Sequence, residues 1–214
     1  MTEAFAKPAS NDTGWPVQVG FALTVGLLLV FYLCTGSIAS SNPHRHLQQQ
    51  AVQACRSIQA MLYLYALDHG GKYPTGKSST EVFQKLIDGK YTTTAEIFWI
   101  PMPGKAKLTS KILKPKNVCW DVTTPVDVHS PNELPVVFIT GFRMTYEPGA
   151  RVIALFQPAE GRLLGFFVCY KGNLSMFLRN EPGTSQVADP VISTTFNPAG
   201  QKFQQLTPEG TLAP

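Results

Sequence analysis

The chain has 214 residues, of which 44% are hydrophobic and only 15% are charged, and its formal net charge is +4. Folded domains usually carry about 25% charged residues. The length suits one hydrophobic core with appendages. The modest charge, without a basic helix or an aromatic RNA-binding motif, argues against a nucleic-acid-binding protein.

An uncharged segment near the N-terminus accounts for much of the low charge. No acid, lysine or arginine lies between Asp12 and Arg45, and residues 15–41 are mostly apolar. About 20 apolar residues cross a bilayer as a helix, in which every backbone group is bonded internally. We therefore predict a short leader at 1–14 and a transmembrane helix at 15–41. A cleaved secretory signal and a buried soluble helix are the alternatives.

A second helix is predicted after Pro43, a residue that kinks or interrupts helices. Apolar residues recur at helical spacing from about Leu47 to His69 and make one stripe. Gly70 and Gly71 then end the helix, because glycine accepts the left-handed conformation of a helix C-terminus. The stripe consists of Leu47, Ala51, Ala54, Cys55, Ile58, Met61, Leu62 and Tyr65.

A short helix and a run of strands are predicted next. Ser78 and Glu81 fit the S-x-x-E pattern of a capping box, and Gly89 ends the short helix. Because helices precede strands, we predict an α+β domain over 42–179, with the long helix on one face of an antiparallel sheet. Short connections that carry Gly or Asn favour hairpins. The predicted strands are 96–101, 117–122, 134–142, 151–157, 162–170 and 174–179.

Residues 180–214 differ in composition from the rest of the chain. They are rich in Pro, Thr, Ser and Gly and have few residues typical of a core. This composition predicts an extended tail or a set of pinned loops.

The sequence lacks the common catalytic and cofactor motifs. It has no phosphate loop, no dinucleotide-binding G-x-G-x-x-G, no H-E-x-x-H and no G-x-S-x-G. His44 and His46 make a poor metal site, since zinc usually takes three or four protein ligands. Asp68 and His69 are adjacent on a helix and do not face each other. We therefore expect no enzyme, no metal and no cofactor.

Five lysines cluster in one predicted loop. One interpretation is a solvated loop, and the other is a contact for an anionic glycan, a lipid or a neighbouring subunit. They are Lys105, Lys107, Lys111, Lys114 and Lys116.

Of the four cysteines, Cys34 lies in the apolar run, and Cys55, Cys119 and Cys169 lie outside it. No C-x-x-C spacing occurs, so neither a zinc ribbon nor a thioredoxin-type site is indicated. A disulfide between Cys119 and Cys169 can form if the domain is periplasmic. The alternative is burial of the thiols as small apolar side chains.

The segment ALDHGGKYPTG at 66–76 resembles the end of the long N-terminal helix in type II secretion pseudopilins and type IV pilins. In that family the helix ends in a similar turn that leads to Tyr-Pro. The resemblance covers about 15–179 and includes an aliphatic run ending in Gly-Phe at 136–142 and a terminal hairpin at 166–178. The matching turn residues are Asp68, Gly70, Gly71, Tyr73 and Pro74.

The sequence Gly20-Phe21-Ala22-Leu23 resembles the junction at which prepilins are cleaved. By that resemblance Gly20 ends the leader and Phe21 starts the mature chain. Val25 then occupies the fifth mature position, where the family usually has a glutamate that neutralises the N-terminal amine of a neighbouring subunit. This departure fits a minor or tip subunit, or a protein that never enters a filament. We assign Gly20, Phe21, Leu23 and Val25 to processing and assembly.

The resemblance implies a pilin-like fold, in which one long N-terminal helix spans the membrane and continues as an amphipathic helix on an antiparallel sheet. It also implies a subunit or accessory component of a type IV pilus or type II secretion-type assembly, held in the bacterial inner membrane. The domain would lie in the periplasm or on an extracellular filament. Its partners would be other pilin or pseudopilin subunits, secretion machinery, the membrane and an extracellular or host ligand. The alternative is a permanently membrane-anchored surface or periplasmic binding module, such as an adhesin.

Overall fold

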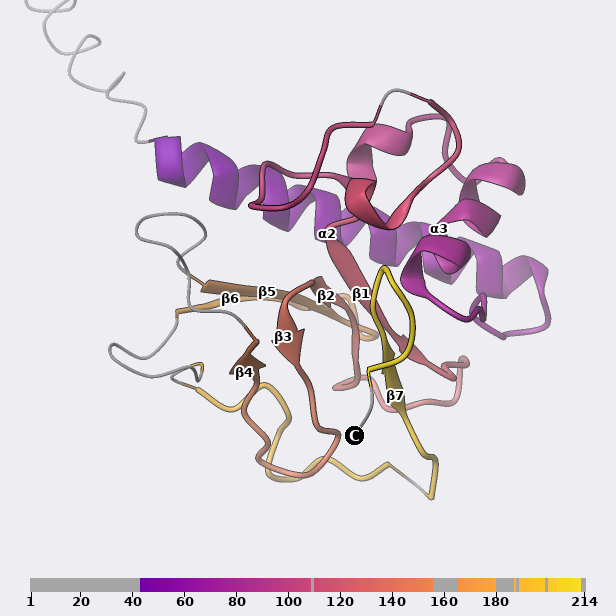
Figure 1. The fold of residues 1–214 in the computed structure, drawn as a ribbon. Helices are drawn as coiled ribbons and strands as arrows, with labels where there is room; N and C mark the ends of the chain where they lie inside the picture. The colour runs from indigo at the N-terminus through magenta and orange to yellow at the C-terminus, as the bar shows by residue number, and fades with distance from the viewer. Residues whose placement is uncertain are drawn as a thin grey trace, which may run out of the picture. The chain divides into compact units, whose positions relative to one another are not determined.

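The computed structural model describes residues 43–108, 110–155, 165–179, 187, 189–198 and 200–212. In this part of the chain, helices α2 and α3 lie on one side of a five-stranded antiparallel sheet, and the small β3–β4 sheet lies on the other (Figure 1). The elements are α2 (Pro43–Asp68), α3 (Ser79–Asp88), the 3-10 helices η1 (Ala95–Phe98) and η2 (Pro115–Asn117), and the strands β1 (Trp120–Thr124), β2 (Pro135–Ile139), β3 (Phe142–Arg143), β4 (Ile153–Ala154), β5 (Gly165–Tyr170), β6 (Ser175–Arg179) and β7 (Gln204–Leu206).

Helix α2 buries the predicted apolar stripe against β2, β5 and β6. Leu47 and Tyr65, at the ends of the stripe, are half-buried, and Ala66 joins it as a buried residue. The predicted packing of this helix face on the sheet is therefore confirmed. Burial of one large aliphatic side chain stabilises the folded state by about 1.5–3 kcal/mol.

The predicted turn after α2 is also confirmed. Gly70 and Gly71 have φ angles of 63° and 82°, and the Gly71 N–H donates to Ala66 O at 2.8 Å. Only glycine adopts two such angles in succession at little cost. The chain then joins the loop after β1, because the Tyr73 N–H donates to Val126 O at 3.0 Å.

Helix α3 begins at the predicted cap. The Ser78 hydroxyl accepts from the Glu81 N–H at 3.2 Å, as a capping box requires. The Glu81 carboxylate reaches back one residue further than expected and accepts from the Lys77 N–H at 2.8 Å. The Ser79 hydroxyl donates to Trp120 O at 2.7 Å and so ties the start of α3 to β1.

The five-stranded sheet has the order β6-β5-β2-β1-β7, and every neighbouring pair is antiparallel. The β5–β6 hairpin pairs Val168 with Met176, which confirms the predicted terminal hairpin. Side chains alternate between the two faces of a strand. One face of the sheet therefore packs on α2, and the other packs on β3 and the C-terminal segment.

Several predicted strands are wrong or only partly right, and the two clearest cases are 96–101 and 134–142. Residues 96–101 form η1 and irregular chain instead of a strand, although the Cys119 N–H still donates to Phe98 O at 2.9 Å. The predicted strand at 134–142 is interrupted at Gly141, whose φ is 94°. This turn sends the chain from β2 into β3 of the second sheet, so one apolar run serves two sheets.

The C-terminal segment is part of the domain in its described residues, which corrects the prediction of a tail at 180–214. Strand β7 pairs with β1 and forms one edge of the sheet. This segment also contributes buried apolar residues to the core. They are Val187, Val191, Ile192, Phe196 and Leu206.

The predicted fold class, a pilin-like chain built on one long N-terminal helix, is wrong. The described residues hold a 26-residue helix that begins at Pro43, a 10-residue helix, and a sheet completed by C-terminal residues. Residues 1–14 and 15–41, the predicted leader and transmembrane helix, lie outside the described residues. Among the described helices, none is both long enough and apolar enough to cross a bilayer.

Candidate functional site

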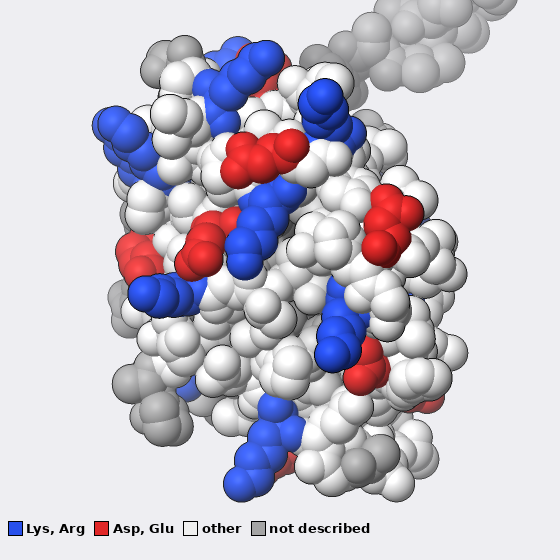
Figure 2. All heavy atoms as spheres, turned by 90° about the vertical axis from the view of Figure 1, so that its right-hand side faces the viewer, with Lys and Arg blue, Asp and Glu red and all other residues white. Residues whose placement is uncertain are grey.

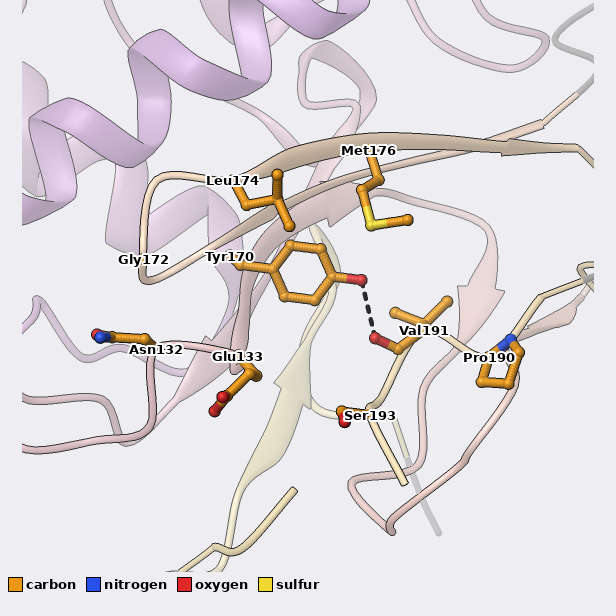
Figure 3. Close-up of a pocket in the computed structure, with 9 residues that line it drawn as sticks. All are labelled: Asn132, Glu133, Tyr170, Gly172, Leu174, Met176, Pro190, Val191 and Ser193. Carbon is orange, nitrogen blue, oxygen red and sulfur yellow. Dashed lines mark hydrogen bonds between the residues drawn. The ribbon is translucent and has the colours of Figure 1, made fainter. Parts of the chain in front are cut away.

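The candidate site is a pocket of about 380 Å³ on the sheet face opposite α2. We call it the hairpin pocket, because the β5–β6 hairpin forms one wall (Figure 3). The other walls come from the loop before β2 and from the C-terminal segment. Its lining residues are Asn132, Glu133, Tyr170, Gly172, Leu174, Met176, Pro190, Val191 and Ser193.

The tip of the β5–β6 hairpin is held by local and long-range hydrogen bonds. The Tyr170 N–H donates to Leu174 O at 2.8 Å, and Asn173 takes a φ of 64°, which asparagine tolerates better than most residues. The Gly172 N–H donates to Asn132 O at 2.9 Å. A side chain at Gly172 would crowd the Asn132 backbone. The tip is therefore fixed against the loop that forms the opposite wall.

Tyr170 connects the hairpin to the C-terminal wall. Its hydroxyl donates to Val191 O at 2.8 Å, as Figure 3 shows. Burial raises the pKa of Tyr170 to about 12, so the hydroxyl stays protonated and keeps its role as a donor. One hydrogen bond thus joins two walls that are distant in sequence.

Apolar side chains dominate the pocket next to the Tyr170 ring. Leu174 is 58% exposed, and Met176 is half-buried beside it. Such exposure of a large aliphatic side chain is ordinary when isolated, but here it borders a concave apolar site. The pocket can therefore accept an aliphatic or aromatic group.

One carboxylate, Glu133, stands at the edge of the pocket. Glu133 is exposed, and no ion pair to it is found within the described residues. The nearby ammonium of Lys171 is used elsewhere, since it donates to Val128 O at 2.8 Å and to Ser130 O at 2.6 Å. Burial lowers the pKa of Lys171. The charge at the pocket edge is thus negative.

The described residues contain no cluster of three or more His, Cys, Asp or Glu side chains that could hold a metal ion. The pocket lining offers a carboxylate, amide, hydroxyl and backbone groups, with no paired nucleophile and base. This lining can accept an apolar group, with a cation beside the carboxylate.

A cluster of polar side chains lies next to another hollow, which is separate from the hairpin pocket. This hollow has a volume of about 600 Å³, and Tyr146 and Gln205 are among its lining residues. Asp121 on β1 is fully buried and accepts from the Gln205 amide. The Tyr146 hydroxyl lies 2.8 Å from the Thr123 hydroxyl. Because Asp121 has no solvent access, we interpret this cluster as part of the packing between the two sheets.

The lysine cluster predicted as an anionic contact is divided by ion pairs. Lys105 pairs with Glu209 at 3.3 Å, and Lys107 pairs with Glu96 at 3.5 Å. Figure 2 shows basic and acidic side chains interspersed on one face of the molecule. Lys111, Lys114 and Lys116 are exposed. Two of the five lysines therefore have acidic partners, and the contact with an anionic ligand stays a prediction.

The predicted disulfide between Cys119 and Cys169 is wrong. Strand β2 lies between the strands next to these residues, and the Cys119 thiol donates to Ile100 O at 3.3 Å. Burial raises the pKa of Cys119 to about 11. Cys169 instead lies beside Cys55 of α2, and all three are free thiols in the structure.

The remaining predicted site residues have separate locations. Asp68 accepts from the Tyr91 hydroxyl at 2.8 Å at the end of α2, and Pro74 follows Tyr73 as a buried residue of the turn. They do not line the hairpin pocket. The predicted processing and assembly residues lie outside the described residues; they are Gly20, Phe21, Leu23 and Val25.

The chain matches no protein-family model, and no curated protein or solved structure is significantly similar to it.

Sequence reasoning missed the hairpin pocket, because its residues come from three separate segments. A weak signal existed in the predicted strand at 174–179. Leu174, Met176 and Leu178 alternate with Ser175, Phe177 and Arg179, so one face of the strand is apolar throughout. An apolar face needs a cover, and the sequence alone does not identify the segment that supplies it.

Proposed function

We propose that this chain is a non-enzymatic, membrane-anchored binding module of the bacterial envelope, with its domain in the periplasm or on the cell surface. The apolar segment 15–41 would be the anchor. Recognition would occur at the hairpin pocket, by contact with a protein partner. The observation that carries this proposal is the exposed Leu174 beside Met176 in a concave apolar site.

The lining of the pocket indicates the chemistry of the partner. The apolar wall suits an aliphatic or aromatic side chain, and Glu133 suits a lysine or arginine next to it. An exposed ion pair contributes only about 0.2–1 kcal/mol, so the apolar contact supplies most of the affinity and the charge supplies selectivity.

A peptide selection tests this function. The full-length protein in detergent is presented to a library of random linear peptides, and Kd values of the selected peptides are measured by calorimetry. We expect selected peptides to share an apolar residue beside Lys or Arg. Leu174→Glu should weaken binding about tenfold or more, which corresponds to about 1.4 kcal/mol. Glu133→Gln should weaken it about two- to fivefold.

The matched control is Ile112→Glu, which also places a carboxylate at an exposed aliphatic position, 68% exposed and away from the pocket. Its binding should equal that of the wild type. Selection without a shared motif, or equal losses in the Leu174 and Ile112 variants, would contradict the proposal.

A second candidate function is a subunit or accessory component of a type IV pilus or type II secretion-type assembly. The observation that favours it is a second apolar stripe on α2, on the side away from the sheet. Tyr63, Leu64 and Leu67 are 44%, 50% and 56% exposed, and Ala60 continues the stripe. Residues at this spacing share one helix face, which could pack on a helix of a neighbouring subunit.

Charged substitutions on this stripe test the second candidate. Leu64→Asp combined with Leu67→Asp should abolish chemical cross-linking of the protein into multimers in native membranes. Both residues are exposed, so the fold should be little affected. Gln50→Asp combined with Gln53→Asp is the matched control on exposed positions of the same helix and should leave cross-linking intact.

Equal cross-linking in both double variants would count against the assembly role. Intact mass and N-terminal sequencing of the same membranes add an independent readout. A mature chain that begins at Phe21 would support an assembled subunit, whereas an unprocessed chain would support the fixed anchor of the binding module.

A further inference from the structure

Three side chains of α2 contact the β5–β6 hairpin on the face opposite the pocket. The Arg56 guanidinium donates to the Ser175 hydroxyl at 2.6 Å. The Gln59 amide donates to Lys171 O at 3.3 Å. Cys55 lies between α2 and the sheet and is 1% exposed. These contacts hold the hairpin that forms the pocket wall.

Cys55 and Cys169 face each other across this helix–sheet interface. The Cys55 thiol donates to Val137 O at 3.5 Å, and Val137 is the cross-strand neighbour of Cys169. The Cys169 thiol is also close enough to Cys55 to help raise the pKa of the Cys55 thiol. Cys169 is 2% exposed, so both sulfurs are enclosed in the same part of the core.

We propose that Cys55 and Cys169 form a disulfide that cross-links helix α2 to strand β5 and fixes the pocket hairpin to the helix. A disulfide of low molecular mass, such as oxidised glutathione, is the oxidant. The thiolate of one cysteine attacks a glutathione sulfur and releases one reduced glutathione. The second thiolate then attacks the mixed disulfide at the protein sulfur and releases another. Two protein thiols are oxidised, and one glutathione disulfide is reduced to two thiols.

Burial governs when this reaction can occur. Burial is the main reason that the pKa of Cys55 lies well above its ordinary value, with the Cys169 thiol adding to the effect. Little thiolate is therefore present in the folded protein, and exchange requires local opening or incomplete folding. We expect the bond to form rapidly during folding and slowly afterwards.

The bond would join positions roughly 110 residues apart and so restrict the unfolded chain strongly. The temperature midpoint of unfolding should rise by about 10 °C on oxidation, provided that the bond forms without strain. Cys55 is adjacent in sequence to Arg56, which contacts Ser175 next to the tip of the hairpin. The pocket wall would thus be fixed covalently to α2.

Peptide mapping of the full-length protein tests the proposal. One sample is incubated folded in a glutathione redox buffer, and another is refolded from urea in the same buffer. Both are then alkylated and digested with trypsin. We expect the tryptic peptides 46–56 and 163–171 to appear as one cross-linked species. Its mass should be 2 Da below the sum of the two peptide masses, and a reductant should separate the two peptides. Cys119 should remain alkylated.

Cys55→Ala should abolish the cross-link, and Cys119→Ala, a matched change at another buried thiol, should preserve it. Alkylation of both Cys55 and Cys169 in the refolded sample would overturn the proposal, as would a cross-link between other cysteines. The inference does not depend on the proposed binding function. A protein that fails to select peptides can still form this bond, so the two failures are distinguishable.

Discussion

Replacing Asp121 by asparagine should remove most of the loss of stability that the wild-type domain shows as the pH rises from about 4 to 7. Asp121 is fully buried in the middle of β1. Burial raises its pKa from 3.8 to about 7, against the opposing effects of hydrogen bonds from Thr140 and Gln205. Lys105 lowers this pKa further, and Glu209 raises it.

The direction of the pH dependence follows from proton binding. Between pH 3.8 and about 7 the folded state keeps a proton on Asp121 that the unfolded state releases. Stability contributed by this group is therefore fully present below pH 3.8 and is lost as the pH rises through 7. Each unit of pKa difference corresponds to about 1.4 kcal/mol, so the expected loss is about 4 kcal/mol.

Asparagine can replace the protonated acid without a charge. Its carbonyl can accept from the Gln205 amide, and its amide group can occupy the place of Asp121 Oδ1, close to the Thr140 hydroxyl. In the wild type Oδ1 has no partner that meets strict hydrogen-bond geometry. The variant should therefore be more stable than the wild type at pH 8 and of similar stability near pH 4.

Urea unfolding, followed by tryptophan fluorescence at several pH values, measures this effect. Trp120 is fully buried next to Asp121 and reports on this part of the core. Asp88→Asn, at an exposed position at the end of α3, is the matched control and should keep the wild-type decrease. A wild-type curve that is flat between pH 4 and 7 would show that Asp121 is not protonated in the folded protein.

The second large effect is expected from Phe83→Ala, which should destabilise the domain by about 3–5 kcal/mol. Phe83 of α3 is fully buried and stacks on Phe98 of η1, with 4.7 Å between ring centroids and 18° between ring planes. Removing the ring loses its burial and leaves a cavity. The start of α3 is tied to distant segments, since the Ser79 hydroxyl donates to Trp120 O and the Ser79 N–H donates to Thr207 O, so the cavity cannot close easily.

Comparison with Leu64→Ala tests whether burial of the side chain is the cause of this loss of stability. Leu64 is 50% exposed on the outer face of α2, and truncation there should cost about 0.5 kcal/mol or less. Both variants are measured by urea unfolding at the same pH. A similar small cost for Phe83→Ala would mean that α3 and η1 do not pack as a unit in solution.

Several elements could be predicted because their signals are local. The buried face of α2 depends on apolar residues three or four positions apart, and the cap of α3 depends on Ser78 and Glu81. The turn at Gly70 and Gly71 and the hairpin at 171–173 depend on residues that accept positive φ angles. Each signal lies within a few positions of the structure that it specifies.

Other predictions failed because strand formation depends on partners. Residues 96–101 are apolar enough for a strand, yet they bury Phe98 and Ile100 around η1 without forming a regular strand ladder. Residues near Gln205 look like a polar tail, yet they form the edge strand β7. There Gln205 provides hydrogen bonds to Asp121 and to Phe142 O. The choice depends on which distant segment supplies backbone partners.

The sequence by itself determined the apolar stripe of α2, the glycine turn that ends this helix, the cap of α3 and the terminal hairpin. Only the tertiary structure decided the strand order, the burial of Asp121, the proximity of Cys55 to Cys169 and the convergence of Glu133, Tyr170 and Val191 on one pocket. The physical reason is that periodicity and capping act over a few residues. Burial and strand pairing instead depend on contacts between segments that are far apart in the sequence. Neither segment alone indicates which partner it will have.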